Sequence, residues 1–231
     1  MLRLTTTILA LILTFSHAFA DELDKITIAG WSKPISEITN ILAEPDKGFF
    51  KAEKIELGYI SGTGGGSALT NMLSGAADVA FTDPSSLYQA LSRGEDLVAI
   101  YNIYPQNVFN VVVPVGRGIT TTADLKGKTI GVYSLNSGTR QNLLFLLHKA
   151  GLNESDVNIQ VTGLLNFAPV IQGQVDATAA TDTGLYVGKL KGLGDVTVIN
   201  VADSLNVPSD LFVVTRGYYK ENKSVLRRFL K

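Results

Sequence analysis

Short runs of apolar residues alternate with longer segments of helical spacing along most of the chain. The segment 139–150 has leucines at helical spacing, and Gly151 follows it as a helix stop. Because strand-like runs and helical segments alternate, the pattern predicts an α/β fold with a mostly parallel sheet. The expected strands lie near residues 26–29, 55–60, 79–81, 98–100, 129–133, 177–180 and 196–199.

Two further apolar runs, 108–113 and 211–215, interrupt this alternation. We interpret each as a strand-like crossing between two α/β lobes, and two such crossings make a hinge with a ligand cleft between the lobes. The last residues start a helix that we expect to be truncated. The expected division is a signal peptide at 1–20, a first lobe at 21–113, a second lobe at 114–209, and a return crossing with the start of a first-lobe helix at 210–231.

A weak internal repeat supports the two lobes. Residues 75–83 and 173–182 each begin with a glycine, have an aspartate three residues later, and continue into a short strand that ends in Thr-Asp. Two similar β–α units are the expected result when two lobes share one architecture.

The N-terminus reads as a secretory signal peptide. Arg3 precedes an apolar stretch, and the small-x-small sequence Ala18-Phe19-Ala20 comes just before charged residues. The stretch is shorter than the ~20 residues that a membrane span needs. We therefore expect cleavage after Ala20 and export to a periplasm as a free protein.

Composition excludes several classes of function. The chain of 231 residues has no cysteine and two histidines, so thiolate chemistry, disulfides and a histidine-rich metal site are not expected. Its net charge of −1 gives no electrostatic footprint for nucleic acid or an anionic membrane. We expect no cofactor and no metal.

Two loops rich in glycine and hydroxyl residues, 61–67 and 134–140, each follow an expected strand and open a helix. Such loops let a ligand approach the backbone, and ligands of open α/β sheets bind at the carboxyl ends of strands. The first loop lacks the lysine of a P-loop. Two other interpretations of this loop remain open. One is a dinucleotide-binding loop, with Asp83 as the acid that such a site has further along the chain, and the other is a plain tight turn.

Several other residues have a structural and a functional interpretation. Asp83 before Pro84 is a normal helix N-cap, and Ser137 or Thr139 can cap the following helix. Trp31 is either core or a cleft wall. His148 reads as a solvent-facing helix residue, whereas Arg140 either contacts an anionic ligand or forms a surface ion pair.

Five segments in order carry a resemblance to a known family: the signal peptide and residues 58–67, 73–83, 124–132 and 172–177. The chain resembles the substrate-binding proteins of ABC importers in the nitrate, sulfonate, taurine and thiamine-precursor (NMT1/SsuA-like) group. The resemblance implies a type II periplasmic binding protein fold that closes on a small molecule. The ligand contacts it implies are Trp31, Thr63, Gly64, Gly65, Ser67, Asp83, Asn110, Ser137, Gly138, Thr139 and Asp182.

We therefore expect a monomeric periplasmic solute-binding protein, not an enzyme, that captures a monoanion or a heterocycle and delivers it to an ABC permease in the inner membrane. Nucleic acid is not an expected partner. A solute receptor of a tripartite transporter or a sensor is the alternative. A secreted enzyme that uses the carboxylates Asp83 and Asp182 is a further one, although neither lies in a recognisable catalytic motif. The pyrimidine synthase that shares the resemblance is rich in cysteine, which this chain lacks.

Overall fold

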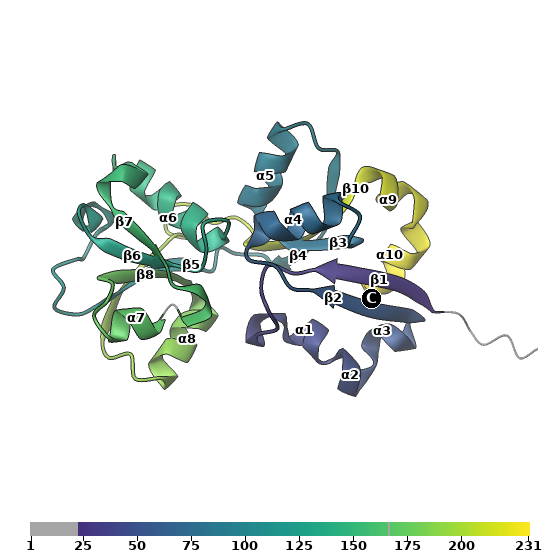
Figure 1. Cartoon of the computed structure of the whole chain (residues 1–231), viewed down its shortest axis with the longest axis horizontal. Coiled ribbons are helices and arrows are strands. Elements are labelled where there is room, and N and C mark those ends of the chain that lie inside the picture. Colours follow the sequence, from purple (N-terminus) through teal and green to yellow (C-terminus); the bar gives the residue numbers. More distant parts are fainter. Residues whose placement is uncertain (1–22, 166) are drawn as a thin grey trace, which may run out of the picture.

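A computed structural model describes residues 23–165 and 167–231, which form two α/β lobes joined by two crossing segments (Figure 1). The expected signal peptide, residues 1–20, lies outside the described residues. Within the described part, no helix combines the length and the apolar character that a membrane span requires.

The first lobe is built on a five-stranded sheet with the strand order β2-β1-β3-β10-β4. Strands β1, β2 and β3 are parallel, and β10 runs antiparallel to both of its neighbours. The strands are β1 (Asp24–Ala29), β2 (Ile55–Ile60), β3 (Val79–Thr82), β4 (Leu97–Tyr104) and β10 (Asp210–Thr215). The helices are η1 (Ser36–Ile38), α1 (Thr39–Leu42), α2 (Glu44–Lys47), α3 (Phe49–Ala52), α4 (Gly65–Leu73), α5 (Pro84–Ser92), α9 (Arg216–Glu221) and α10 (Lys223–Phe229).

Apolar side chains cover both faces of this sheet. Helices α4 and α5 bury residues such as Leu69 and Leu87 against one face. On the other face, Ile38 and Ile41 belong to one apolar cluster with Phe212, whose ring packs against that of Phe229 on α10. A sheet buried on both faces explains why its strands read as continuous apolar runs.

The second lobe repeats this plan with the strand order β7-β6-β8-β5-β9, in which β5 is the antiparallel strand. Helix α6 covers one face of the sheet, and α7 and α8 cover the other. The strands are β5 (Phe109–Pro114), β6 (Thr129–Val132), β7 (Asn158–Val161), β8 (Ala177–Thr181) and β9 (Val196–Asn200). The helices are η2 (Thr122–Leu125), α6 (Gly138–Lys149), η3 (Glu154–Asp156), η4 (Gly163–Leu165), α7 (Phe167–Ile171) and α8 (Asp182–Leu190).

The internal repeat corresponds to equivalent positions in the two sheets. Asp78 and Asp176 each precede the third strand of their sheet, β3 and β8. The carboxylate of Asp78 accepts a hydrogen bond from the N–H of Thr27 at 2.8 Å, and that of Asp176 accepts one from Thr129 at 2.9 Å. The repeated aspartate therefore ties the start of the third strand of each sheet to its neighbour in second position, β1 or β6.

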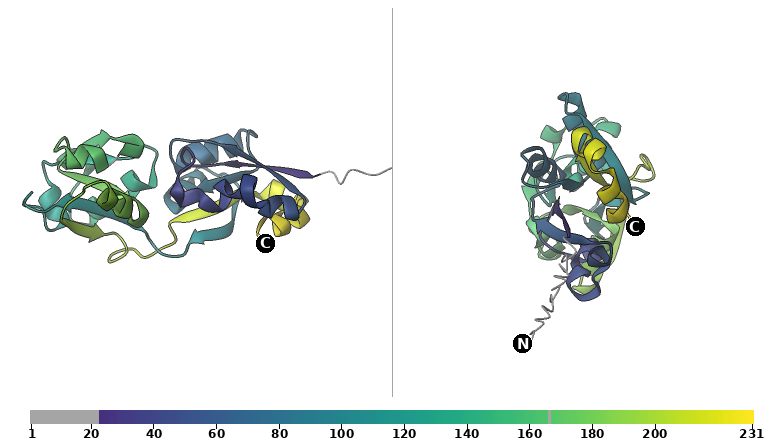
Figure 2. Two further views of the ribbon diagram at one scale, coloured as in Figure 1. Left: turned by 90° about the horizontal axis from the view of Figure 1, so that it is seen from below. Right: turned by 90° about the vertical axis from the view of Figure 1, so that its right-hand side faces the viewer.

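The first crossing lies earlier than the sequence pattern suggested. Residues up to 113 were expected in the first lobe, but β5 pairs with β8 and β9 in the second sheet. The crossing is therefore the short segment 105–108, because the whole apolar run is needed as a central strand. The second crossing was also misplaced: the run 211–215 was expected to cross between the lobes, but it is β10 of the first sheet, paired with β3 and β4. The crossing is the preceding segment 201–209, which was expected in the second lobe, and Figure 2 (left) shows both crossing segments connecting the lobes.

Hydrogen bonds join the two crossings. The hydroxyl of Ser209 donates to the carbonyl of Gln106 at 2.7 Å and accepts from the N–H of Val108 at 2.8 Å. The amide of Asn107 donates to the carbonyl of Leu205 at 3.0 Å. The crossings therefore form one double-stranded hinge.

Candidate ligand-binding site

A cavity of about 430 Å³ lies between the lobes and is lined from both of them. Its first-lobe wall, called the polar wall below, carries three carboxylates, and its second-lobe wall combines apolar side chains with polar ones. These polar residues of the second lobe are Tyr133, Ser137, Thr139, Thr181, Thr183 and Lys191. Members of the polar wall are Trp31, Glu37, Asp83, Tyr104 and Asp210. The apolar part of the second-lobe wall, called the apolar wall below, consists of Phe109, Leu164, Phe167, Ala168 and Val187, and Val108 of the first crossing adjoins it.

The two glycine and hydroxyl loops meet at the edge of this cavity. The hydroxyl of Ser134 donates to the carbonyl of Thr63 at 2.5 Å, which joins the lobes directly. Gly64 has φ +131°, and a Cβ there would lie 2.2 Å from the carbonyl oxygen of Asn136. A side chain at residue 64 would therefore hold the lobes apart.

The second-lobe loop is organised by hydroxyl groups. Ser137 is the N-cap of α6 and accepts from the N–H of Arg140 at 3.4 Å. Its hydroxyl lies 2.7 Å from that of Thr139, which also accepts from the N–H of Tyr133 at 3.1 Å. These bonds hold the start of α6 against the end of β6, with Ser137, Gly138 and Thr139 at the cavity.

Asp83 is the N-cap of α5, as its position before Pro84 predicts. One carboxylate oxygen accepts from the N–H of Ser86 at 2.9 Å, and the other accepts from the hydroxyl of Ser86 at 2.8 Å. A Cβ at Gly65 would lie 2.0 Å from the second oxygen, so only glycine lets α4 approach this carboxylate. Burial raises the pKa of Asp83, and the bonds from Ser86 oppose that shift.

Asp210 is the second buried acid of the cavity and is 7% exposed. Burial, together with the negative charges of Asp83 and Glu37, raises its pKa well above the usual value. Glu37 lies on η1, and its carbonyl accepts from the hydroxyl of Tyr104 at 2.7 Å. The polar wall is thus a concentration of negative charge.

Aromatic rings join the two walls. Trp31 packs edge-on against Tyr133 of the second lobe, with ring centroids 6.1 Å apart, and against Phe81 of β3 at the same distance. Its indole N–H is buried and, among the described residues, has no hydrogen-bond partner. Trp31 is therefore a cleft wall with a free donor rather than a core residue alone.

The residues expected to contact a ligand fall into two groups. Those that line the cavity are Trp31, Gly64, Gly65, Asp83, Ser137, Gly138 and Thr139. Those outside its lining are Thr63, Ser67, Asn110 and Asp182.

Local contacts explain why these four residues lie outside the cavity lining. The side chain of Thr63 is exposed at the loop junction, and Ser67 points toward Gly62 at the start of α4. The amide of Asn110 donates to Asp182 at 2.9 Å, so these two side chains bind each other. Thr181 and Thr183 flank Asp182 and line the cavity in its place. Asp83 and Asp182 therefore do not face one another across the cavity as an acid pair.

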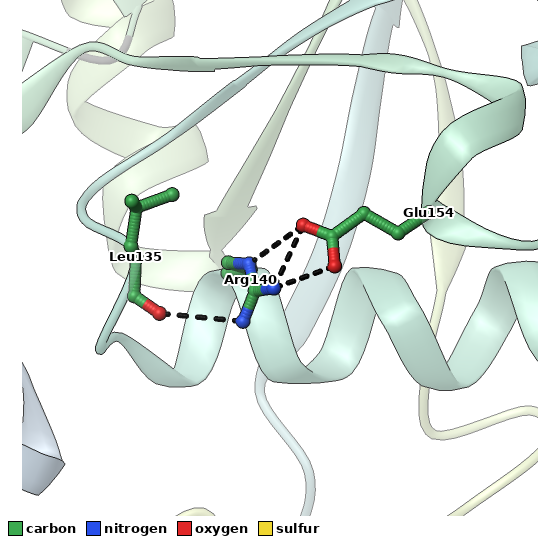
Figure 3. A network of polar contacts seen from close by, with 3 residues as sticks. All are labelled: Leu135, Arg140 and Glu154. Carbon is green, nitrogen blue, oxygen red and sulfur yellow. Dashed lines mark hydrogen bonds and ion pairs between the residues drawn. The ribbon is translucent and has the colours of Figure 1, made fainter.

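Arg140 forms an ion pair outside the cavity (Figure 3). Its guanidinium donates to both carboxylate oxygens of Glu154, at 2.7 and 2.6 Å, and to the carbonyl of Leu135 at 3.4 Å. The ion-pair interpretation of Arg140 is therefore confirmed. His148 is exposed on α6, as expected.

Sequence reasoning missed several cavity residues. Glu37 and Tyr104 had no motif around them, and Phe167 lies in a segment with no clear helical pattern. Asp210 is the first residue of β10, whose start lies at the same sheet edge as the carboxyl end of β3 only because β10 runs antiparallel to β3. The run 211–215 gives no signal for that direction, so the sequence could not have found Asp210.

The chain belongs to the NMT1/THI5-like family, whose pattern it matches over residues 35–231. It is 31% identical over 179 residues to a putative thiamine biosynthesis protein of Haemophilus influenzae, covering 76% of this chain and 55% of that protein. It is 24% identical over 213 residues to the riboflavin-binding protein RibY of Chloroflexus aurantiacus, covering 90% of this chain and 60% of that protein. The chain thus spans little more than half the length of these two relatives.

Solved structures show the same fold. The periplasmic aliphatic sulphonate binding protein SsuA of Escherichia coli superposes with a TM-score of 0.67 at 24% identity, covering 90% of this chain and 70% of that one. The chain therefore has the two-lobed α/β fold of periplasmic binding proteins, as its sequence predicted.

Proposed function

We propose that the protein is a periplasmic solute-binding protein that captures a small molecule between its lobes and delivers it to an ABC import permease. The observation that carries this proposal is the cavity lined by both lobes, at the carboxyl ends of β3 and β6. Open α/β sheets bind ligands at such positions. One copy of the chain supplies both walls, so the proposal needs only a monomer.

Capture follows from the hinge and the divided cavity. A ligand that touches both walls gains contacts in the closed state that it cannot make in the open state. It therefore shifts the equilibrium toward closure by its differential affinity for the two states. No proton transfer or covalent step is needed, and the permease would recognise the closed form.

The wall chemistry bears on the choice between a monoanion and a heterocycle. Glu37, Asp83 and Asp210 line the cavity, while Arg140 is paired with Glu154 outside it. A monoanion would meet these three carboxylates, and Lys191 of α8 is the one cationic side chain among the described lining residues. The aromatic residues Trp31 and Tyr133 suit a flat ring. We therefore favour a heterocycle as the ligand.

A thermal-shift screen tests the proposal. The panel holds alkanesulfonates, nitrate, aromatic acids, pyrimidines, riboflavin and aromatic amines. A ligand at 100 times its Kd adds about 2.7 kcal/mol of stability, which is about 5–10 °C for a chain of this size. A shift with one class is expected. If no compound shifts the melting temperature of the folded protein, the proposal is wrong.

A matched pair of variants locates the binding. Thr183→Trp, on α8 at the cavity, fills the space with a ring and should abolish the ligand-induced shift. Tyr186→Trp is the control, because Tyr186 lies on the same helix, is exposed and does not line the cavity. An equal response of the two variants would place the ligand elsewhere on the protein.

A further inference from the structure

We propose that the ligand is an organic cation whose nitrogen head donates hydrogen bonds to Asp210 and whose flat or apolar body rests against the second lobe. This inference rests on the proposed function, because it names the ligand class of the same cavity. It starts from the unequal walls of the cavity: the first lobe contributes the carboxylates, and the second lobe contributes apolar side chains together with hydroxyl groups and Lys191.

Strand register brings the two buried acids together. The antiparallel pairing of β10 with β3 sets Leu211 opposite Thr82 as its last pair. Asp210 and Asp83 are the next residues along the chain at this same end of the pair, and the negative charge of Asp83 is one of the causes that raise the pKa of Asp210. The empty fold therefore holds two acids where their charges repel.

The two acids differ in what they bind. Asp83 accepts two hydrogen bonds from Ser86, whereas no residue in the described part of the chain donates one to the carboxylate of Asp210. Asp210 is also more than nine-tenths buried and lines the cavity. The fully buried side-chain atoms without a partner in the described residues do not include those of Asp210, so its carboxylate opens to the cavity, where a ligand can reach it. A ligand that brings a positive charge and N–H donors relieves both the repulsion and the missing bonds.

The surroundings favour an organic cation over a metal ion. Within residues 23–165 and 167–231, no three histidine, cysteine or acidic side chains are grouped so that they could hold a metal. Trp31, Tyr104 and Tyr133 line the same space, and aromatic faces attract organic cations. Among the described lining residues, Lys191 is the one cationic side chain, and it lies on α8 in the opposite lobe.

Size and the apolar wall define the rest of the ligand. The cavity volume of about 430 Å³ falls within the range of about 300–1,000 Å³ that is typical of organic ligands. Phe109, Phe167 and Val187 offer apolar surface to a ring or hydrocarbon body. An inorganic ion would leave this wall uncovered.

Calorimetry with benzamidine, benzamide and benzoate tests the inference. These compounds share one ring and carry a cationic, a neutral and an anionic head. We expect benzamidine to bind the purified protein at least tenfold more tightly than benzamide, and benzoate not to bind. This comparison on the wild-type protein needs no variant, so it holds whether or not a substitution at the site folds.

Variants then assign the cation to its partner. Asp210→Asn removes the charge at nearly constant volume and should weaken benzamidine binding at least tenfold, with benzamide binding unchanged. Asp46→Asn is the control, because Asp46 is exposed on α2 and far from the cavity lining. Unchanged benzamidine binding by a folded Asp210→Asn variant would overturn the assignment.

The outcomes separate this inference from the proposed function. Binding of benzoate or of a sulfonate in preference to benzamidine would overturn the cation and leave the solute-binding function standing. Failure of every compound, in this series and in the thermal-shift panel, would overturn both.

Discussion

Gly64→Ala tests whether the lobes close through the contact between the two loops. A Cβ at this residue would lie 2.2 Å from the carbonyl oxygen and 2.6 Å from the carbonyl carbon of Asn136. Ordinary contacts of a Cβ begin near 3.4 Å, so the lobes must separate before the methyl group fits. The substitution should therefore oppose closure while both lobes stay folded.

The size of the effect follows from the crowding. Overpacking of this kind costs about 1–3 kcal/mol, which lowers the closed population roughly 5- to 160-fold. Apparent ligand affinity falls by the same factor, because only the competent state binds tightly. The φ of +131° adds backbone strain of about 1–3 kcal/mol, which lowers the melting temperature in the open and the closed state alike.

Small-angle X-ray scattering and ligand titration measure the two consequences. Gly64→Ala should have a larger radius of gyration than the wild type and a weaker affinity for whichever compound the screen identifies. Gly66→Ala is the control, because a Cβ there meets Asn136 at an ordinary 3.8 Å. Wild-type dimensions and affinity within twofold for Gly64→Ala would refute closure through this contact.

Three further predictions concern other parts of the molecule. Burial and neighbouring acids raise the pKa of Asp210 in the folded protein. The stability contributed by its protonated form is therefore fully present below the pKa of the unfolded state and is lost as the pH rises through the pKa of the folded state. Asp210→Asn should therefore melt a few degrees above the wild type at pH 8. If thermal scans show that this difference in melting temperature increases toward pH 4, the predicted pH dependence is wrong. Arg140→Gln removes a partly exposed ion pair with Glu154 and should cost at most about 1 kcal/mol in urea unfolding, without changing ligand affinity. Ser209→Ala breaks the hydroxyl bridge between the crossings and should cost about 1–3 kcal/mol; no loss of stability would mean that the bridge does not hold the hinge.

Much of the fold was predictable because each lobe buries both faces of its sheet. The runs 55–60, 129–133 and 177–180 match strands to within one residue, and the helix expected at 139–150 is α6 to within a residue. Strand β7 was missed, because its residues are mostly exposed at the sheet edge and form no apolar run.

The boundary of the first lobe was misplaced for a related reason. An apolar run such as 109–114 shows that a strand is buried but not which sheet buries it. The strands that pair with such a run are distant from it in the chain, so the residues of the run do not indicate which strands they are.

The site was predictable only where a loop or a cap marks it. Gly64, Asp83 and Ser137 each sit in a recognisable strand-to-helix turn. The partners of a buried acid are set by register across strands that are far apart in the chain. Asp210 lies close enough to be influenced by the charge of Asp83 because β10 inserts between β3 and β4, and the local sequence around either aspartate does not encode that insertion.

The central claim is that a small molecule binds between the lobes and closes them. Scattering profiles of the purified protein, recorded with and without the best compound of the thermal-shift panel, test it most directly. The account predicts that the compound lowers the radius of gyration of the wild type and leaves that of Thr183→Trp unchanged. A compound that binds the wild type tightly without compacting it, or that compacts both proteins equally, would contradict it.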